Sequence, residues 1–257
     1  MKTIKLTQNL EGEIVKITIS WLQEKNACPD GIEWFRKKYS EQLDGVKYQS
    51  ILDDLGKENK CDWAEWLISN AGITKDTLEI KGDLILEHSI FYAGCIKVTG
   101  RIVTNYCIEA GGSIKAGGGI EAGGSIKAGG SIKAGGSIKA GGGIEAGESI
   151  QAGGSIKAGG SIKAVGRIQA GGGIEAGESI QAGGRIKAVG SIEAGWRIKA
   201  GGGIEAGWSI QAGWSIQAVG GIEAGWSIQG GLWNICRYIS KIITQINLCD
   251  FKIQNKA

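Results

Sequence analysis

Side chains that could carry out acid–base or metal chemistry are scarce in this chain. Its 257 residues include one histidine, His88. The chain has six cysteines, namely Cys28, Cys61, Cys95, Cys107, Cys236 and Cys249. No two of them have the CxxC spacing that is typical of zinc sites and redox motifs. We therefore expect reduced, mostly buried thiols, and we predict no catalytic residue, no metal site and no cofactor.

The composition indicates a repetitive protein. The chain contains 46 glycines but one proline, which excludes collagen and proline-rich linkers and favours a repeat. Its 29 basic and 26 acidic residues give a net charge of +3, so the charge alone does not indicate a polyanion-binding protein. No apolar stretch is long enough for a membrane span, and the first ten residues do not resemble a secretory signal. We expect a soluble, cytoplasmic protein that does not bind membranes.

A six-residue period organises most of the sequence. Every sixth residue from Leu78 to Ile228 is leucine or isoleucine, and from Ala110 to Ala224 alanine stands two places after it. Residues two apart point to the same face of a strand. The glycine that follows most alanines suits a bend and disfavours a helix. The repeat therefore predicts short strands joined by corners.

Variation among the repeats shows which positions face inward. The second position holds Lys, Glu or Gln, the fifth holds Gly, Glu or Trp, and the sixth holds Ser, Gly or Arg. A position that accepts glycine, glutamate and tryptophan is not a packed interior site, because burying an unpaired carboxylate costs several kcal/mol. We expect only the isoleucines and alanines to face the interior.

Units of this kind resemble two families, the hexapeptide-repeat β-helices and the bactofilin-type polymer-forming scaffolds. The resemblance covers residues 78–233. It implies a mainly β fold, a triangular single-stranded β-helix of about 18 residues per coil. Hexapeptide-repeat proteins are often acyltransferases that use a histidine base and an extruded loop. Here no insertion interrupts the period and His88 lies near its start, so we expect a protein that is not an enzyme.

The tryptophans in the last repeats are the strongest candidates for partner binding. With about 18 residues per coil, Trp196 stacks on Trp214 and Trp208 stacks on Trp226, which predicts two ladders on neighbouring edges. Exposed tryptophan is enriched at binding hot spots, and four together make an apolar cluster. The alternative is that the rings lie flat over glycine corners and shield the sheet.

Lysines in the first half of the repeat form a second candidate surface. Lys115, Lys133 and Lys139 are the residues that we single out there for partner binding. Glu109, Glu121 and Glu145 interleave with the lysines and oppose binding of a phosphate backbone. Nucleic acid is therefore the less favoured partner.

We predict three regions: a small helical module at 1–77, the β-helix at 78–231, and a C-terminal amphipathic capping helix and tail at 232–257. In the first region, alternation predicts strands over 3–6 and 13–19, and helices are expected near 21–25, 31–39, 47–55 and 62–70. Ser20 with Gln23 and Asp30 with Glu33 have the spacing of capping boxes. The expected core of the module consists of Trp21, Trp34, Phe35, Trp63, Trp66 and Leu67.

The segments WLQEKNACPDGIEWFRKKY and KCDWAEWLIS resemble a small helical module at the N-terminus of many phage and prophage proteins. The resemblance implies a mobile-element origin. From it we hypothesise a non-catalytic protein-binding β-solenoid, a monomer or small homo-oligomer in the host cytoplasm, that inhibits a host defence complex such as a CRISPR effector. One alternative is a self-assembling scaffold similar to bactofilins, and another is a nucleic-acid-binding protein.

Overall fold

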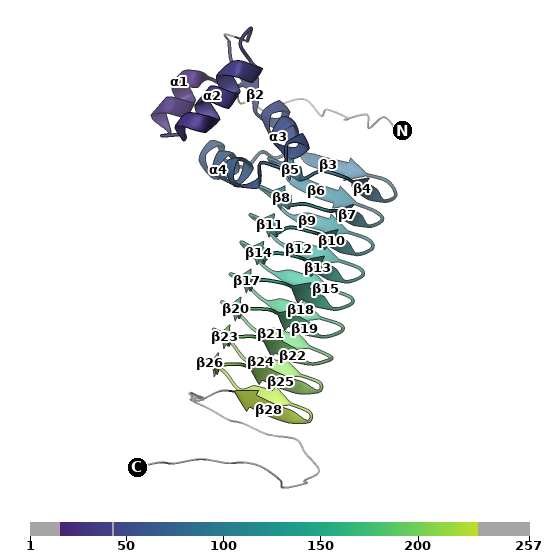
Figure 1. The fold of residues 1–257 in the computed structure, drawn as a ribbon. Coiled ribbons are helices and arrows are strands. Elements are labelled where there is room, and N and C mark those ends of the chain that lie inside the picture. Colours follow the sequence, from purple (N-terminus) through teal and green to yellow (C-terminus); the bar gives the residue numbers. More distant parts are fainter. Residues whose placement is uncertain (1–15, 43, 231–257) are drawn as a thin grey trace, which may run out of the picture.

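The computed structural model describes residues 16–42 and 44–230, which form a helical domain at one end of a long β-solenoid (Figure 1). The strand predicted at 3–6 and the capping helix predicted at 232–257 lie outside the described residues. Within the described part, no helix is long and apolar enough to cross a membrane.

The described part of the helical domain contains four helices and a small antiparallel sheet of two short strands, which are separated in the chain by the first two helices. The elements are β1 (Lys16–Ile17), α1 (Ile19–Glu24), α2 (Pro29–Lys38), β2 (Val46–Lys47), α3 (Tyr48–Lys57) and α4 (Cys61–Ala71). All four helices lie near their predicted positions. The strand predicted over 13–19 is shorter in the described residues, because α1 begins at Ile19.

Both predicted capping boxes are wrong. The Thr18 hydroxyl caps α1 by accepting a hydrogen bond from the Trp21 amide at 3.1 Å, so Ser20 lies inside the helix. Helix α2 begins at Pro29, which suits the first helical position because its missing N–H would have no partner there. Asp30 therefore lies in the first turn of α2, where its charge favours the positive end of the helix dipole.

The aromatic residues predicted as the core of this domain do pack there. Phe35 and Leu67 are buried, and the four tryptophans lie half-buried against that core. Trp21 meets Trp66 edge to face with ring centroids 6.1 Å apart, and Trp34 meets Trp63 in the same way at 5.9 Å. These contacts stabilise a domain too small to bury a large core.

The solenoid has three parallel sheets, which we call faces 1, 2 and 3 (Figure 1). Face 1 consists of β3 (Thr77–Ile80), β6 (Cys95–Val98), β9 (Ile114–Ala116), β12 (Ile132–Ala134), β15 (Ile150–Ala152), β18 (Ile168–Ala170), β21 (Ile186–Ala188), β24 (Ile204–Ala206) and β27 (Ile222–Ala224). Face 2 consists of β4 (Leu84–Leu86), β7 (Ile102–Thr104), β10 (Ile120–Ala122), β13 (Ile138–Ala140), β16 (Ile156–Ala158), β19 (Ile174–Ala176), β22 (Ile192–Ala194), β25 (Ser209–Ala212) and β28 (Ser227–Gly230). Face 3 consists of β5 (Ile90–Tyr92), β8 (Ile108–Ala110), β11 (Ile126–Ala128), β14 (Ile144–Ala146), β17 (Ile162–Ala164), β20 (Ile180–Ala182), β23 (Arg197–Ala200) and β26 (Ser215–Ala218).

Each strand pairs with the strand three units further on, so equivalent residues form columns along the solenoid. Ile120, for example, is in register with Ile138, and Ala122 with Ala140. The isoleucines and alanines of the repeat point inward and form one continuous core, as the sequence predicts. The second position of each unit points outward, so its side chains form one external column on each face.

The corners of the solenoid are tight because consecutive coils touch through their backbones. At the fourth position, a Cβ on Gly129 would lie well inside contact distance of the Gly111 carbonyl oxygen, and Gly141 and Gly123 show the same relation. Serines at the sixth position add a ladder of their own. The Ser113 hydroxyl accepts a hydrogen bond from the Ser131 amide of the next coil at 3.0 Å.

The helical domain covers the exposed edge of β5 at the first end of the solenoid. Gln49 of α3 donates to the Phe91 carbonyl at 2.9 Å and accepts from the Ala93 amide at 3.1 Å, as a neighbouring strand would. Asn59 accepts from the Ser89 amide at 2.8 Å. These side chains satisfy backbone groups that otherwise attract another strand.

A disulfide between Cys61 and Cys107 joins α4 to the second coil, so the expectation of reduced cysteines is wrong for this pair. Their Cα atoms are 6.4 Å apart, within the range that a disulfide spans. The pairing depends on α4 folding back over the solenoid, which the spacing of 46 residues does not reveal. Cys28 is exposed and Cys95 is partly exposed, which also differs from the buried thiols expected; Cys236 and Cys249 lie outside the described residues.

Candidate interaction surface

The four tryptophans form the two predicted ladders. Trp196 and Trp214 stack with ring centroids 6.5 Å apart and an interplanar angle of 21°. Trp208 and Trp226 stack at 5.9 Å and 13°. Their exposed fractions are 65 %, 68 %, 59 % and 72 % in that order. Rings that lay flat over the glycine corners would be largely covered, so this exposure disfavours the shielding alternative.

The tryptophans make two ridges and not the single apolar cluster that we predicted. Trp208 directly precedes β25 and Trp214 closely follows it, so the ladders occupy the two corners that bound face 2. Between them lie polar side chains of face 2, including exposed Gln211 and Gln229. The separation arises because the ladders belong to repeats that end on different corners.

The structure brings together two of the three candidate lysines. Lys115 and Lys133 are directly in register on face 1. Lys139 lies on face 2, where its ammonium is 3.0 Å from the Glu121 carboxylate. Lys139 therefore does not belong to the same surface as the other two.

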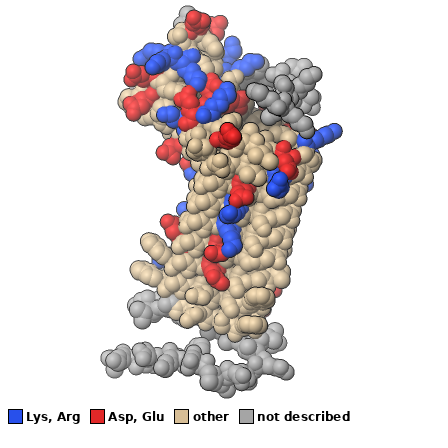
Figure 2. Space-filling view, turned by 45° about the vertical axis from the view of Figure 1, so that its right-hand side comes forward, with Lys and Arg blue, Asp and Glu red and all other residues tan. Residues whose placement is uncertain are grey.

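Charges on face 2 largely compensate one another. Its outward column places Glu121, Lys139, Lys157, Glu175 and Glu193 in succession. Lys157 lies 2.6 Å from Glu175, and this interaction raises the pKa of Lys157. Figure 2 shows charged side chains of both signs in a narrow stripe along the shaft.

Face 1 carries a groove of about 550 Å³ along its edge with face 2. Outward side chains of face 1 form one wall, namely Lys115, Lys133, Gln151, Gln169 and Lys187. Glycines of the corner line the groove beside them, and Val189 lines its far end. No aspartate or glutamate is among the lining residues that the structure describes. The 18-residue period places these outward side chains on one face, but the hollow beside the glycine corner depends on the shape of the corner and was not predicted.

A buried carboxyl group lies where α4 meets face 3. Glu109 is 8 % exposed, and burial together with the nearby Glu65 carboxylate raises its pKa to about 7, although Lys127 acts in the opposite direction. Lys127 forms an ion pair with Glu65 of α4. Glu109 stands at the second position of its unit, where we expected exposed side chains. It is buried because the helical domain covers it.

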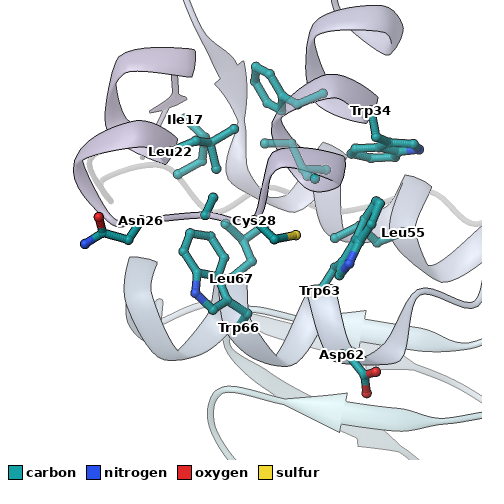
Figure 3. Close-up of a pocket in the computed structure, with 14 residues that line it drawn as sticks. Ile17, Leu22, Asn26, Cys28, Trp34, Leu55, Asp62, Trp63, Trp66 and Leu67 are labelled. Carbon is teal, nitrogen blue, oxygen red and sulfur yellow. The ribbon is translucent and has the colours of Figure 1, made fainter.

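The helical domain encloses a second hollow, of about 330 Å³ (Figure 3). Its lining is mainly apolar and includes Trp34, Trp63 and Trp66, with Cys28 near the centre of the view. The Trp34 indole donates a hydrogen bond to Glu58 at 2.8 Å. This hollow lies among the residues that we predicted as the core of the domain.

His88 has a structural contact in the turn before β5. Its Nδ1 lies 2.8 Å from the Ser89 carbonyl oxygen, which implies that this nitrogen carries the proton. Among the described residues, no group of three or more His, Cys, Asp or Glu side chains could hold a metal ion.

The fold and these surfaces define a β-solenoid protein with an N-terminal helical cap. Residues 3–72 match the family model described as the YdhT N-terminal domain. That match covers the helical domain but not the solenoid. No curated protein and no solved structure gives a match to the chain.

Proposed function

We propose that this chain is a non-catalytic binding protein whose two tryptophan ladders contact a protein partner. The single observation that supports this proposal most is the exposure of four large indoles in preformed stacked pairs. Each ladder presents roughly 300 Å² of aromatic surface, at the lower end of the size of the largest apolar patches on ordinary monomers, which are often functional. Stacking also fixes the rings before binding, which reduces the entropy lost on association.

The alternative of a self-assembling scaffold requires solenoids to join end to end. Gln49 and Asn59 cover the β5 edge at the first end, which disfavours growth from that edge. Size-exclusion chromatography over a range of concentrations separates the two proposals. A binder elutes as a monomer or small oligomer, whereas filaments that grow with concentration would favour the scaffold.

A capture experiment tests the ladders. The purified full chain carrying an affinity tag is incubated with an extract of its source cells, beside the double variant Trp208→Ala/Trp214→Ala. The matched control is Ile85→Ala/Val165→Ala, which removes two exposed apolar side chains elsewhere on the solenoid. Because truncated hot-spot residues each cost about 2 kcal/mol or more, we expect the tryptophan variant alone to lose the partner. Equal capture by all three proteins would overturn the proposal.

The more specific hypothesis names the partner as a host defence complex, such as a CRISPR effector, with the protein acting in the host cytoplasm. It is supported by the resemblance of the first module to those of phage proteins. Mass spectrometry of the captured partner tests it, and capture of a protein outside any defence complex would reject the specific hypothesis while retaining the binding function. Nucleic acid remains the second alternative, supported by the adjacent lysines Lys115 and Lys133.

A further inference from the structure

We propose that the groove between faces 1 and 2 binds an extended acidic segment of a polypeptide partner, with its carboxylates at Lys115 and Lys133. The proposal rests on the proposed binding function and assigns the chemistry of the partner. It also places a second contact region beside the Trp208 ladder.

Two neighbouring lysines without an acidic partner carry the argument. Lys115 and Lys133 are in register, a coil apart, and neither forms an ion pair with any residue that the structure describes. Like charges directly opposite on neighbouring strands destabilise a sheet. On face 2, the equally adjacent pair Lys139 and Lys157 is neutralised by glutamates. The face 1 lysines therefore favour an anionic ligand from outside.

The rest of the groove extends this charge into a track. Beyond Lys133 the same wall offers the amides of Gln151 and Gln169, and then Lys187, whose ammonium lies 2.7 Å from Glu205. On the opposite edge of face 1, Glu148 accepts a hydrogen bond from Ser131 at 2.8 Å, away from the groove. With a rise of about 4.8 Å per coil, the groove runs for about 19 Å, the length of roughly six extended residues.

Apolar side chains lie at the far end of this track. Val189 lines the groove and is 62 % exposed, and Trp208 belongs to the next coil of the same corner. An acidic segment that continues into apolar residues would therefore match both the lysines and the start of the ladder.

A polypeptide fits this surface better than nucleic acid does. The described lining of the groove holds three lysines, and one of them is already paired, so few phosphates could be neutralised. A nucleic-acid duplex would also extend over the neighbouring column of face 2 and approach Glu121, Glu175 and Glu193. An extended peptide is narrow enough to contact the groove alone.

The role of the groove lysines in binding is tested with a fluorescein-labelled peptide of about six glutamates followed by two glycines and two leucines. The number of glutamates matches the length of the groove. Binding to the full chain is followed by fluorescence anisotropy, with a glutamine version of the peptide as the uncharged control. We expect Lys115→Gln/Lys133→Gln to weaken binding about tenfold, since two exposed charge contacts are lost. The matched control Lys139→Gln/Lys157→Gln removes the same charges from face 2 and is expected to bind as the original chain does. Glutamine is native at this position of other repeats, so both variants should fold.

The shape of the groove is tested by tryptophan substitutions at the fifth position, which already carries tryptophan in the last coils. Gly136→Trp places a ring on the groove corner, and Gly160→Trp places one on the corner of the Trp196 ladder. We expect only Gly136→Trp to block the peptide. Circular dichroism of each variant verifies the fold.

Three results would overturn the acidic-segment proposal. The two lysine variants could bind the acidic peptide with equal affinity, the original chain could fail to bind it, or the chain could bind an oligothymidylate of similar length more tightly. None of these results would affect capture through Trp208 and Trp214. Failure of the proposed function would show in a different experiment, as capture of the partner that does not depend on the tryptophans.

Discussion

Replacing Glu109 with glutamine should abolish a pH-dependent loss of stability where the helical domain meets face 3. The Glu109 carboxyl group is buried against the helical domain, and its pKa is raised from an ordinary 4.5 to about 7. In the unfolded chain the group ionises above about pH 4.5, whereas in the folded protein it holds its proton up to about pH 7. Its contribution to stability is therefore complete below 4.5 and is lost as the pH rises to 7.

The size of the effect follows from the pKa difference. Each unit of pKa difference corresponds to about 1.4 kcal/mol, so the full loss is about 3 kcal/mol. Between about pH 5 and pH 8 the original chain should lose about 2.5 kcal/mol more than the Glu109→Gln variant, in which no proton is bound or released at this position.

Urea unfolding followed by the helical circular dichroism signal measures this difference, because the described helices all belong to the N-terminal domain. The free energy of unfolding is measured at about pH 5 and about pH 8 for both proteins. Glu145→Gln is the matched control, since Glu145 is exposed and lies two coils further along the same outward column. It should keep the pH dependence of the original chain.

The same pH dependence in the original chain and in Glu109→Gln would refute the reasoning. The reasoning would also be refuted if the losses of unfolding free energy between about pH 5 and pH 8 differed by less than about 0.5 kcal/mol between the two proteins. Glu109 would then not be the group that titrates.

Two further predictions concern the corners and the disulfide. Gly141→Ala should destabilise the solenoid by about 1 kcal/mol in urea unfolding, because its Cβ meets the Gly123 carbonyl oxygen and the coils must shift apart there. The native valine at this position of another unit, Val165, shows such a shift, since its amide lies 3.3 Å from the Ala146 carbonyl oxygen, against 2.9 Å between Gly141 and Ala122. Gly160→Ala, with no such contact, should unfold at the same or a slightly higher urea concentration. Equal midpoints for the two would contradict this account of the corners. Cys61→Ser should lower the stability of the helical domain by about 2–4 kcal/mol under oxidising conditions and have little effect in excess reductant. An equal loss in both conditions would show that the sulfurs do not pair.

The six-residue period predicted the solenoid well because the core depends on a local rule. Isoleucine and alanine two apart need one strand to bury both, and the repeat imposes that geometry at every unit. The ladders followed from the same rule, since Trp196 and Trp214 are three units apart. Their exposure, and the polar strip that separates the two ridges, required the arrangement of the corners in space.

The disulfide and the burial of Glu109, which the sequence did not reveal, depend on contacts between distant segments. Cys61 pairs with Cys107 and Glu109 is buried only because α4 lies over face 3. Lys115 and Lys133 are 18 residues apart, so the period that stacks the tryptophans also places them on one face, whereas Lys139 belongs to the next unit and falls on the next face. The true cap of α1, Thr18, has a sequence signal of its own, but the Ser20 and Gln23 pattern competes with it.

Each strand of the solenoid pairs with the strand three units further on, and the units from Ile108 to Ala224 have the same length and core. The number of units is therefore free to vary. A gene that gains or loses any whole number of units would still close a regular coil, so such changes need not disturb folding. Only changes by a multiple of three units would keep each surface residue on its original face. All other changes would move every later side chain to a new face, so small duplications could rearrange the binding surface while the buried architecture stays the same.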